Sequence, residues 1–306
     1  MYVMSIHIVP KPHSTNLRLI SNLSAGDYAP NTMIDKADVA NLPLNTITKF
    51  GSALIAFCRA HGNAKLIIWK SDISQAYQRM PMHKCWQMKQ IHTIDGECHI
   101  DRCNNFGGKG GYGIWSAFMC LVVWIGWYIS LVRFYIYVDD NFGFERVEAR
   151  TFHARLNHWL PLQQARLLDL RDDIGLPYED KKQEWGETLR VIGFDIDPNT
   201  MTVAIPDNAS ERFLQHITEF INVAGTNCRH TLREFQSLAG YANWAFNVYP
   251  LGRPGLCNIY TKMSGKTKAN VHIYLNAAIV RCHTMYVFHS RTWKFTLFFY
   301  AILFLF

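Results

Sequence analysis

Two adjacent carboxylates, Asp139 and Asp140, stand near the centre of the sequence between short runs of aromatic and β-branched residues, 134–138 and 141–144. Such runs favour strands, so the simplest structure is a β-hairpin with the acids at its tip. Adjacent like charges repel and are costly to bury, and a cation usually compensates them. A hard divalent ion held by oxygens, Mg²⁺ above all, is the natural candidate. Asp is also common in turns for backbone reasons alone, which leaves a plain turn open.

A third acid, Asp72, ends the run 65–72, which is typical of a strand. Tyr77 follows it five positions later, in Asp72-Ile73-Ser74-Gln75-Ala76-Tyr77. An Asp in this place could also be a helix cap. Farther along, residues 105–111 form a glycine-rich loop, and glycine lets a backbone approach a ligand closely.

Together these motifs resemble the reverse transcriptases, and the resemblance extends from about Ile8 to Met263. Tyr137-Val138-Asp139-Asp140 is similar to the family's Tyr-x-Asp-Asp signature, and Asp72 with Tyr77 to its first catalytic motif. The resemblance implies an α+β chain with the right-hand polymerase fold, which has an antiparallel palm sheet, fingers and a helical thumb. The implied boundaries are fingers 1–64, palm 65–206, a basic helical thumb 207–268, and a tail, 269–306.

The resemblance also implies a reaction, RNA-directed DNA synthesis by two-metal nucleotidyl transfer, as in retrotransposons. Asp72 and Asp139 would hold two Mg²⁺ ions with Asp140 in support; one ion would lower the pKa of the primer 3′-hydroxyl and the other stabilise the leaving pyrophosphate. Tyr77 would lie against the sugar and exclude a 2′-hydroxyl. Further roles implied in the same way are Lys182 near the pyrophosphate as a proton donor, Lys11 and Arg18 on the triphosphate, Phe106, Gly107 and Val138 at the nucleotide, and Ile192 and Gly193 at the primer.

Two other functions stay open. A decayed or domesticated remnant would bind nucleic acid without catalysis; the missing Ser-Pro or Ala-Pro after the glycine-rich loop and the apolar end of the chain favour it, and the intact acids oppose it. An RNA-dependent RNA polymerase shares the palm chemistry but usually has a small polar residue in the place of Tyr77. Lys181 and Lys182 could equally be a pair of surface lysines.

The charge is unevenly distributed. The chain carries a net +7, and residues 225–306 hold nine Lys or Arg against one acid, a local +8. Such an asymmetry is expected of a surface that follows phosphates, although a solvated basic face would look the same. The expected partners are an RNA or DNA template with its primer and deoxynucleoside triphosphates.

The remaining patterns predict secondary structure and location. We expect helices over 37–60, 151–176 with a break near Pro161, 207–223 and 231–247, and strands over 189–196 and 201–205. The uncharged run 112–132 is long enough to span a membrane, but a span there would separate Asp72 from Asp139, so we expect a buried helix. The eight scattered cysteines indicate reduced thiols and an intracellular protein.

Overall fold

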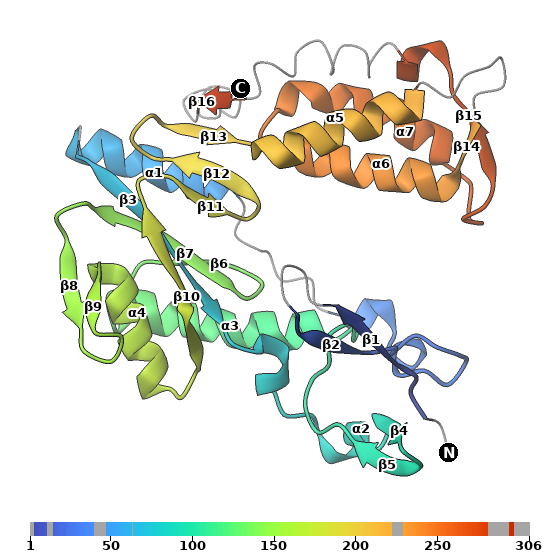
Figure 1. Ribbon diagram of the computed structural model, residues 1–306, viewed down its shortest axis with the longest axis horizontal. Coiled ribbons are helices and arrows are strands. Elements are labelled where there is room, and N and C mark those ends of the chain that lie inside the picture. Colours follow the sequence, from blue (N-terminus) through green and yellow to red (C-terminus); the bar gives the residue numbers. More distant parts are fainter. Residues whose placement is uncertain are drawn as a thin grey trace. The chain divides into compact units, whose positions relative to one another are not determined.

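The structure, a computed structural model, describes residues 3–10, 15–39, 47–62, 64–221, 229–280 and 294–296. Helices and antiparallel strand pairs alternate along the chain, which confirms the α+β class (Figure 1). The chain forms two compact units. The first unit comprises Met1–Asn45, Trp69–Glu145 and Ala149–Glu184, and the second comprises Thr46–Ile68, Arg146–Glu148 and Trp185–Phe306. The lobe boundaries near residues 64, 206 and 268 stay a prediction.

A four-stranded sheet carries the acidic residues. Its order is β10 (Tyr178–Gly186), β3 (Leu66–Ile73), β7 (Asp140–Arg146) and β6 (Tyr135–Tyr137) (Figure 1). Strand β3 begins as a fully buried apolar run and then alternates, with Lys70 and Asp72 half-buried and Ser71 and Ile73 buried. Because strand side chains alternate between faces, Lys70 and Asp72 lie on one face of the sheet and Ser71 on the other.

The uncharged run forms helix α3 (Gly111–Tyr128), as expected. One face is buried, through Trp115, Met119 and Val122, whereas Trp124 and Tyr128 on the other face are exposed, so the expected burial holds for one face only. Among the described residues, α3 is the one helix whose length and mean hydropathy of 1.3 would allow it to cross a membrane, and core helices of proteins outside membranes meet the same criteria.

The predicted helix 151–176 is correct only in its second half, which forms α4 (Leu162–Asp173). The first half is a hairpin of β8 (Arg150–His153) and β9 (His158–Pro161). Its physical reason is a cross-strand aromatic pair, because Phe152 faces Trp159 with ring centroids 6.1 Å apart, and Asn157 takes the left-handed conformation that a tight turn needs, with φ 54°.

Short elements complete the first unit. A hairpin of β1 (Ile6–Pro10) and β2 (Leu17–Ser21) stands at the N-terminus, as predicted. The others are η1 (Pro30–Thr32), η2 (Lys36–Asp38), η3 (Ala76–Arg79), α2 (Lys84–Gln87), β4 (Ile91–Ile94) and β5 (Glu97–Ile100).

The second unit holds α1 (Ile47–His61) and a sheet in the order β11 (Leu189–Val191), β12 (Phe194–Asp197), β13 (Thr202–Ala204) and β16 (Lys294–Thr296). The single strand expected over 189–196 is wrong. Ile192 and Gly193 both have positive φ, 52° and 81°, and make a two-residue turn that pairs Val191 with Phe194.

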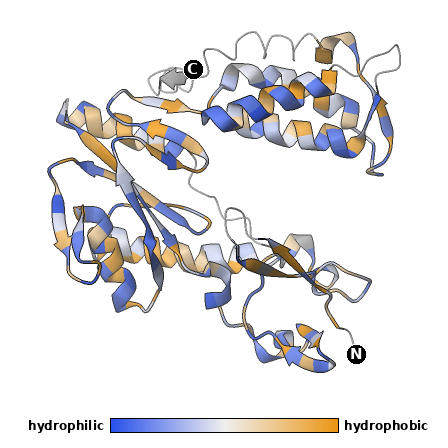
Figure 2. Cartoon of the chain, in the orientation of Figure 1, coloured by the Kyte–Doolittle hydropathy of each residue, from blue (hydrophilic) through white to orange (hydrophobic). Residues whose placement is uncertain are grey.

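Helices dominate the rest of the second unit. They are α5 (Asp207–Ile221), α6 (Leu232–Ala245), η4 (Pro250–Gly252) and α7 (Arg253–Met263), with β14 (Arg229–Thr231) and β15 (His272–Tyr274) paired beside them. Both predicted helices are confirmed. Thr231 and Glu234 form a capping box at the start of α6. Figure 2 shows that α5 carries separate hydrophilic and hydrophobic positions, and its buried residues include Phe213, Ile217 and Phe220.

Candidate active site

Asp72, Asp139 and Asp140 meet in one cavity of the first unit, although the first is far from the others in the sequence. Asp72 lies next to the end of β3, Asp139 in the turn between β6 and β7, and Asp140 at the start of β7. The cavity has a volume of about 260 Å³. Its lining residues are Lys70, Asp72, Asp139, Asp140, Lys182 and Glu184.

The turn that carries the two acids is held at both ends. Tyr137 pairs with Asp140 across the hairpin, so Val138 and Asp139 are the two turn residues. Val138 has φ 59°, in the left-handed region. Asn141, which is fully buried, donates from Nδ2 to the Asp139 backbone oxygen at 3.0 Å. The Asp139 backbone is therefore fixed by a side chain two residues later.

The pKa values of Asp139 and Asp140 are both raised, so ionisation of these two acids is disfavoured. The pKa of Asp140 is raised to about 6, chiefly by burial and then by the charges of Asp139 and Asp72, against which Lys70 and Lys182 act in the opposite direction. Burial also raises the pKa of Asp139, and Asp72 adds to that effect. Carboxylates that resist ionisation in this way lack sufficient positive charge around them, and a divalent cation would supply it. The donor set of carboxylate oxygens is the kind that Mg²⁺ prefers.

Lysines partly compensate the acids. Lys182 Nζ forms an ion pair with Asp72, and a second one with Glu179 at 3.2 Å. Burial disfavours the charged Lys182, but these hydrogen bonds outweigh it, so the pKa of Lys182 is raised. Within the described part of the chain, no group of three or more His, Cys, Asp or Glu side chains is arranged to hold a metal ion. Lys182 occupies the cationic position beside Asp72, and metal binding there requires that ion pair to open.

Two lining residues, Lys70 and Glu184, escaped the sequence analysis. They form an ion pair of 3.1 Å. Strand periodicity could have revealed them, because Lys70 stands two positions before Asp72 and Glu184 two positions after Lys182, which places each pair on one face of its strand.

A buried arginine supports the site from the opposite face of the sheet, and it too was missed. Arg171 of α4 is 0% exposed, and its Nη1 donates to Ser71 Oγ at 2.7 Å and to the Asp72 backbone oxygen at 3.3 Å. Burial lowers the pKa of Arg171 to about 10. The guanidinium contributes positive charge behind the three acids. No sequence signal separates it from the exposed arginines of helical segments.

The predicted sugar-selecting residue, Tyr77, lies in η3 and packs against the glycine-rich loop. Its ring meets that of Phe106 edge-on with centroids 4.7 Å apart. Burial raises the pKa of Tyr77, and the charge of Asp139 adds to the shift, which places the phenol within electrostatic reach of the acids. Gly107 has φ 91°, which favours glycine, and its backbone oxygen accepts a hydrogen bond from Asn31 Nδ2 at 2.9 Å.

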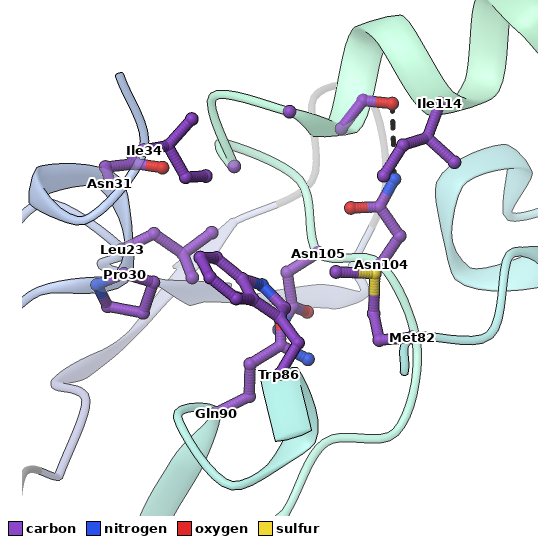
Figure 3. Close-up of a pocket in the computed structure, with 13 residues that line it drawn as sticks. Leu23, Pro30, Asn31, Ile34, Met82, Trp86, Gln90, Asn104, Asn105 and Ile114 are labelled. Atoms are coloured by element: carbon purple, nitrogen blue, oxygen red, sulfur yellow. Dashed lines mark hydrogen bonds between the residues drawn. The ribbon is translucent and has the colours of Figure 1, made fainter. Parts of the chain in front are cut away.

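A second cavity, of about 240 Å³, lies beside the glycine-rich loop in the first unit (Figure 3). Leu23, Ile34 and Trp86 give it an apolar lining, and Asn105 contributes an amide nitrogen that has no hydrogen-bond partner within the described residues. A Cβ built on Gly108 would meet only ordinary contacts, 3.5 Å or longer. The absence of a side chain at Gly108 therefore leaves part of this volume unfilled.

Three of the remaining predicted site residues lie on other described elements, and the fourth lies outside the described residues. Lys11 lies outside the described residues. Arg18 is placed on β2, opposite Val9. Ile192 and Gly193 lie in the second unit, at the turn between β11 and β12.

Solved structures resemble this chain over almost its full length. No protein-family model and no curated protein matches the sequence. A foamy viral protease-reverse transcriptase in complex with double-stranded DNA has a TM-score of 0.62 at 17% identity, covering 94% of this chain and 43% of its own. The same kind of protein with an RNA/DNA hybrid has a TM-score of 0.57 at 17% identity, covering 95% and 33%. Another double-stranded DNA complex has a TM-score of 0.59 at 16% identity, covering 94% and 52%.

These identities show the fold alone, and that fold is reverse-transcriptase-like. The chain spans between 33% and 52% of the length of these three matched chains.

Proposed function

We propose that the chain is a retrotransposon-type RNA-directed DNA polymerase that extends a primer by template-directed nucleotidyl transfer. The observation that carries the proposal is the meeting of Asp72, Asp139 and Asp140 in one cavity. Three strands of a sheet bring these carboxylates together, within a fold that is reverse-transcriptase-like. If Asp139 and Asp140 served only to form the β6–β7 turn, nothing would require Asp72 of β3 beside them.

We propose a role in this reaction for each of these side chains. Asp72 and Asp139 would hold two Mg²⁺ ions, with Asp140 in support, and the bound ions would activate the primer 3′-hydroxyl and stabilise the leaving pyrophosphate. In the metal-free protein the pKa of Lys182 is raised by its partners Asp72 and Glu179, so the side chain is charged. As the proton donor to the pyrophosphate, Lys182 would first have to leave Asp72, which would then hold a metal ion. Tyr77 would lie against the sugar. Arg171 holds the β3 backbone at Asp72 from behind the sheet.

The proposed partners are a primer–template duplex and deoxynucleoside triphosphates. The similar foamy viral proteins are seen with double-stranded DNA and with an RNA/DNA hybrid. The net charge of +8 over residues 225–306 suits a phosphate-bearing partner.

Primer extension on an RNA template, with Mg²⁺ and with Mn²⁺, tests the proposal. We expect the unsubstituted protein to add deoxynucleotides, and Asp139→Asn to slow addition by at least about a hundredfold because it removes a metal ligand. Asp180→Asn is the matched control, because Asp180 is an exposed acid on β10 that does not line the cavity. No extension with either ion by the folded, unsubstituted protein would refute the proposal.

Nucleic-acid binding without catalysis is the second candidate. The ion pair between Lys182 and Asp72 favours it, since it occupies the proposed metal-binding carboxylate. On this account the protein would bind the duplex equally well with and without Mg²⁺, and would extend no primer. An RNA-dependent RNA polymerase would instead reveal itself by adding ribonucleotides in preference to deoxynucleotides.

A further inference from the structure

The backbone at Val138 is in a conformation that needs support. Its φ of 59° lies in the left-handed region, which is unfavourable for a β-branched residue. Residues of this kind keep such a conformation only where their surroundings hold it. Asp139 follows directly, so the position of its carboxylate depends on whatever holds Val138.

Trp115 of α3 supplies that support. Its indole Nε1 donates a hydrogen bond to the Val138 backbone oxygen at 2.7 Å, and its side chain is 0% exposed. The indole N–H can only donate, and the turn offers it the acceptor it needs when buried. A phenylalanine at this position would fill much of the same space without making the bond.

The same indole ring reaches the sugar-selecting side of the site. The rings of Trp115 and Tyr77 have centroids 6.1 Å apart, and Tyr77 in turn meets Phe106 at 4.7 Å. Three aromatic side chains therefore form a row from the glycine-rich loop to the acidic turn. At one end of the row, Trp115 donates to the backbone oxygen of Val138, which precedes the proposed metal ligand Asp139. The middle ring is that of Tyr77, the proposed sugar-selecting residue.

We propose that Trp115 is a positioning residue, which holds the turn carrying Asp139 at a fixed place relative to Tyr77. Sugar selection and metal-ligand placement would then depend on one buried side chain. The proposal rests on the proposed polymerase function for its catalytic consequence, but the link between Trp115 and the turn is a physical claim that can be measured without activity.

Trp115→Phe and Trp127→Phe make a matched pair of variants. Trp127, on the same helix, donates from Nε1 to the Phe134 backbone oxygen at 2.9 Å, at the other end of β6 from the acidic turn. Each variant loses one indole-to-carbonyl hydrogen bond. In the metal-free protein we expect amides of 137–141 to exchange with solvent at least about fivefold faster in Trp115→Phe, the cost of one hydrogen bond, and unchanged in Trp127→Phe.

Single-nucleotide incorporation gives the catalytic readout. We expect Trp115→Phe to lower the deoxynucleotide incorporation rate about tenfold with a less than about threefold change in nucleotide Kd, because misplacement of a catalytic group affects chemistry more than binding. The deoxy-to-ribo preference should fall as well. A side chain that only filled the core would leave that preference unchanged.

The outcomes are separable. Unchanged amide exchange in folded Trp115→Phe, or an unchanged deoxy-to-ribo preference in an active variant, overturns the proposal. If the unsubstituted protein incorporates nothing, the proposed function fails while amide exchange still decides whether Trp115 holds the turn. If Trp115→Phe does not fold, hydrogen exchange of the indole N–H groups is measured in the metal-free unsubstituted protein. The Trp115 N–H should exchange more slowly than that of Trp69, whose buried Nε1 has no hydrogen-bond partner among the described residues, and equally fast exchange overturns the proposal.

Discussion

The guanidinium of Arg171 lies 2.7 Å from the Ser71 hydroxyl oxygen, which joins helix α4 to strand β3 behind the acidic cavity. Arg171 Nε and Nη2 have no hydrogen-bond partner among the described residues. A buried cation with unfilled hydrogen-bonding capacity is a cost to folding that its few partners only partly offset. Its hydrogen bond to the Asp72 backbone oxygen therefore suggests a role in positioning that acid more than in stabilising the fold.

Arg171→Met should confirm this assignment. Met keeps most of the volume and removes the buried charge, so the free energy of unfolding should change by less than about 1 kcal/mol or should rise. Arg171→Ala, by contrast, leaves a cavity and should cost about 2–5 kcal/mol, as large-to-small core substitutions do. Urea denaturation of both variants makes the comparison. A loss near that of Arg171→Ala in the Met variant would mean that the guanidinium itself stabilises the fold.

Asp140→Asn should stabilise the metal-free protein at pH 8. The folded-state pKa of about 6 lies above the ordinary value of 3.8, so the proton on Asp140 favours the folded state, and that contribution is lost as pH rises through 6. The gain should be on the order of 1 kcal/mol, because one pKa unit is worth about 1.4 kcal/mol and water screens the exposed part of the carboxylate.

The gain from Asp140→Asn should vanish near pH 4, where the wild-type carboxyl is protonated in the folded state. Denaturation in EDTA at both pH values measures it, with Glu211→Gln on the exposed side of α5 as the control. An equal effect of Asp140→Asn at the two pH values would show that the charge is not its cause.

Gly143→Ala should destabilise the first unit by about 1–3 kcal/mol, because a Cβ at this position of β7 would collide with the buried Trp69 ring. Gly240→Ala is the matched control. Gly240 lies within α6 with nothing within 4 Å of its Cβ position, so alanine should stabilise the protein by about 0.5–1 kcal/mol there. Thermal unfolding distinguishes the two, and equal melting temperatures for both variants would count against the close approach of β7 to Trp69.

The acidic centre was predictable because its signals are local. The aromatic and β-branched residues around Asp139 predicted the hairpin, and the apolar run before Asp72 predicted β3. The alternation of side chains along a strand would also have placed Lys70 beside Asp72 and Glu184 beside Lys182. Arg171 and Trp115 were not predictable, since their roles come from packing of α4 and α3 against the sheet, which composition does not encode.

The two errors in secondary structure have a common cause. In each place one continuous element was expected where a tight turn decides the outcome. Asn157 closes the β8–β9 hairpin within the expected helix, and Ile192 with Gly193 divides the expected strand. In both places residues with positive φ reverse the chain, and Asn157 and Ile192 are not glycine. Gly193 was a signal for the second turn that the strand assignment passed over, whereas the first turn has only Asn157 to mark it.

Binding of a primer–template duplex should weaken steeply with salt, because each neutralised phosphate releases counterions. Lys266 and Lys268 are exposed in the basic region, and replacing both by Gln should reduce the slope of log K against log salt by about 2 if both contact phosphates. Lys84→Gln with Lys89→Gln removes the same charge from the first unit and should not change the slope. If the affinity of the unsubstituted protein did not depend on salt, the basic residues of 225–306 would form a solvated face and not a phosphate-binding one.

Tyr77→Ala should admit ribonucleotides more than it slows deoxynucleotide addition. The ring of Tyr77 packs against Phe106, and the charge of Asp139 contributes to the raised pKa of the phenol. Under the proposed function, this ring would exclude a 2′-hydroxyl. If Tyr77 were only a packing residue, truncation would instead cost about 3–5 kcal/mol of stability. Tyr77→Phe keeps the ring and should keep the preference. Single-nucleotide incorporation by the folded variants decides, since an unchanged ribo-to-deoxy ratio in stable Tyr77→Ala would remove the gate and favour an RNA polymerase.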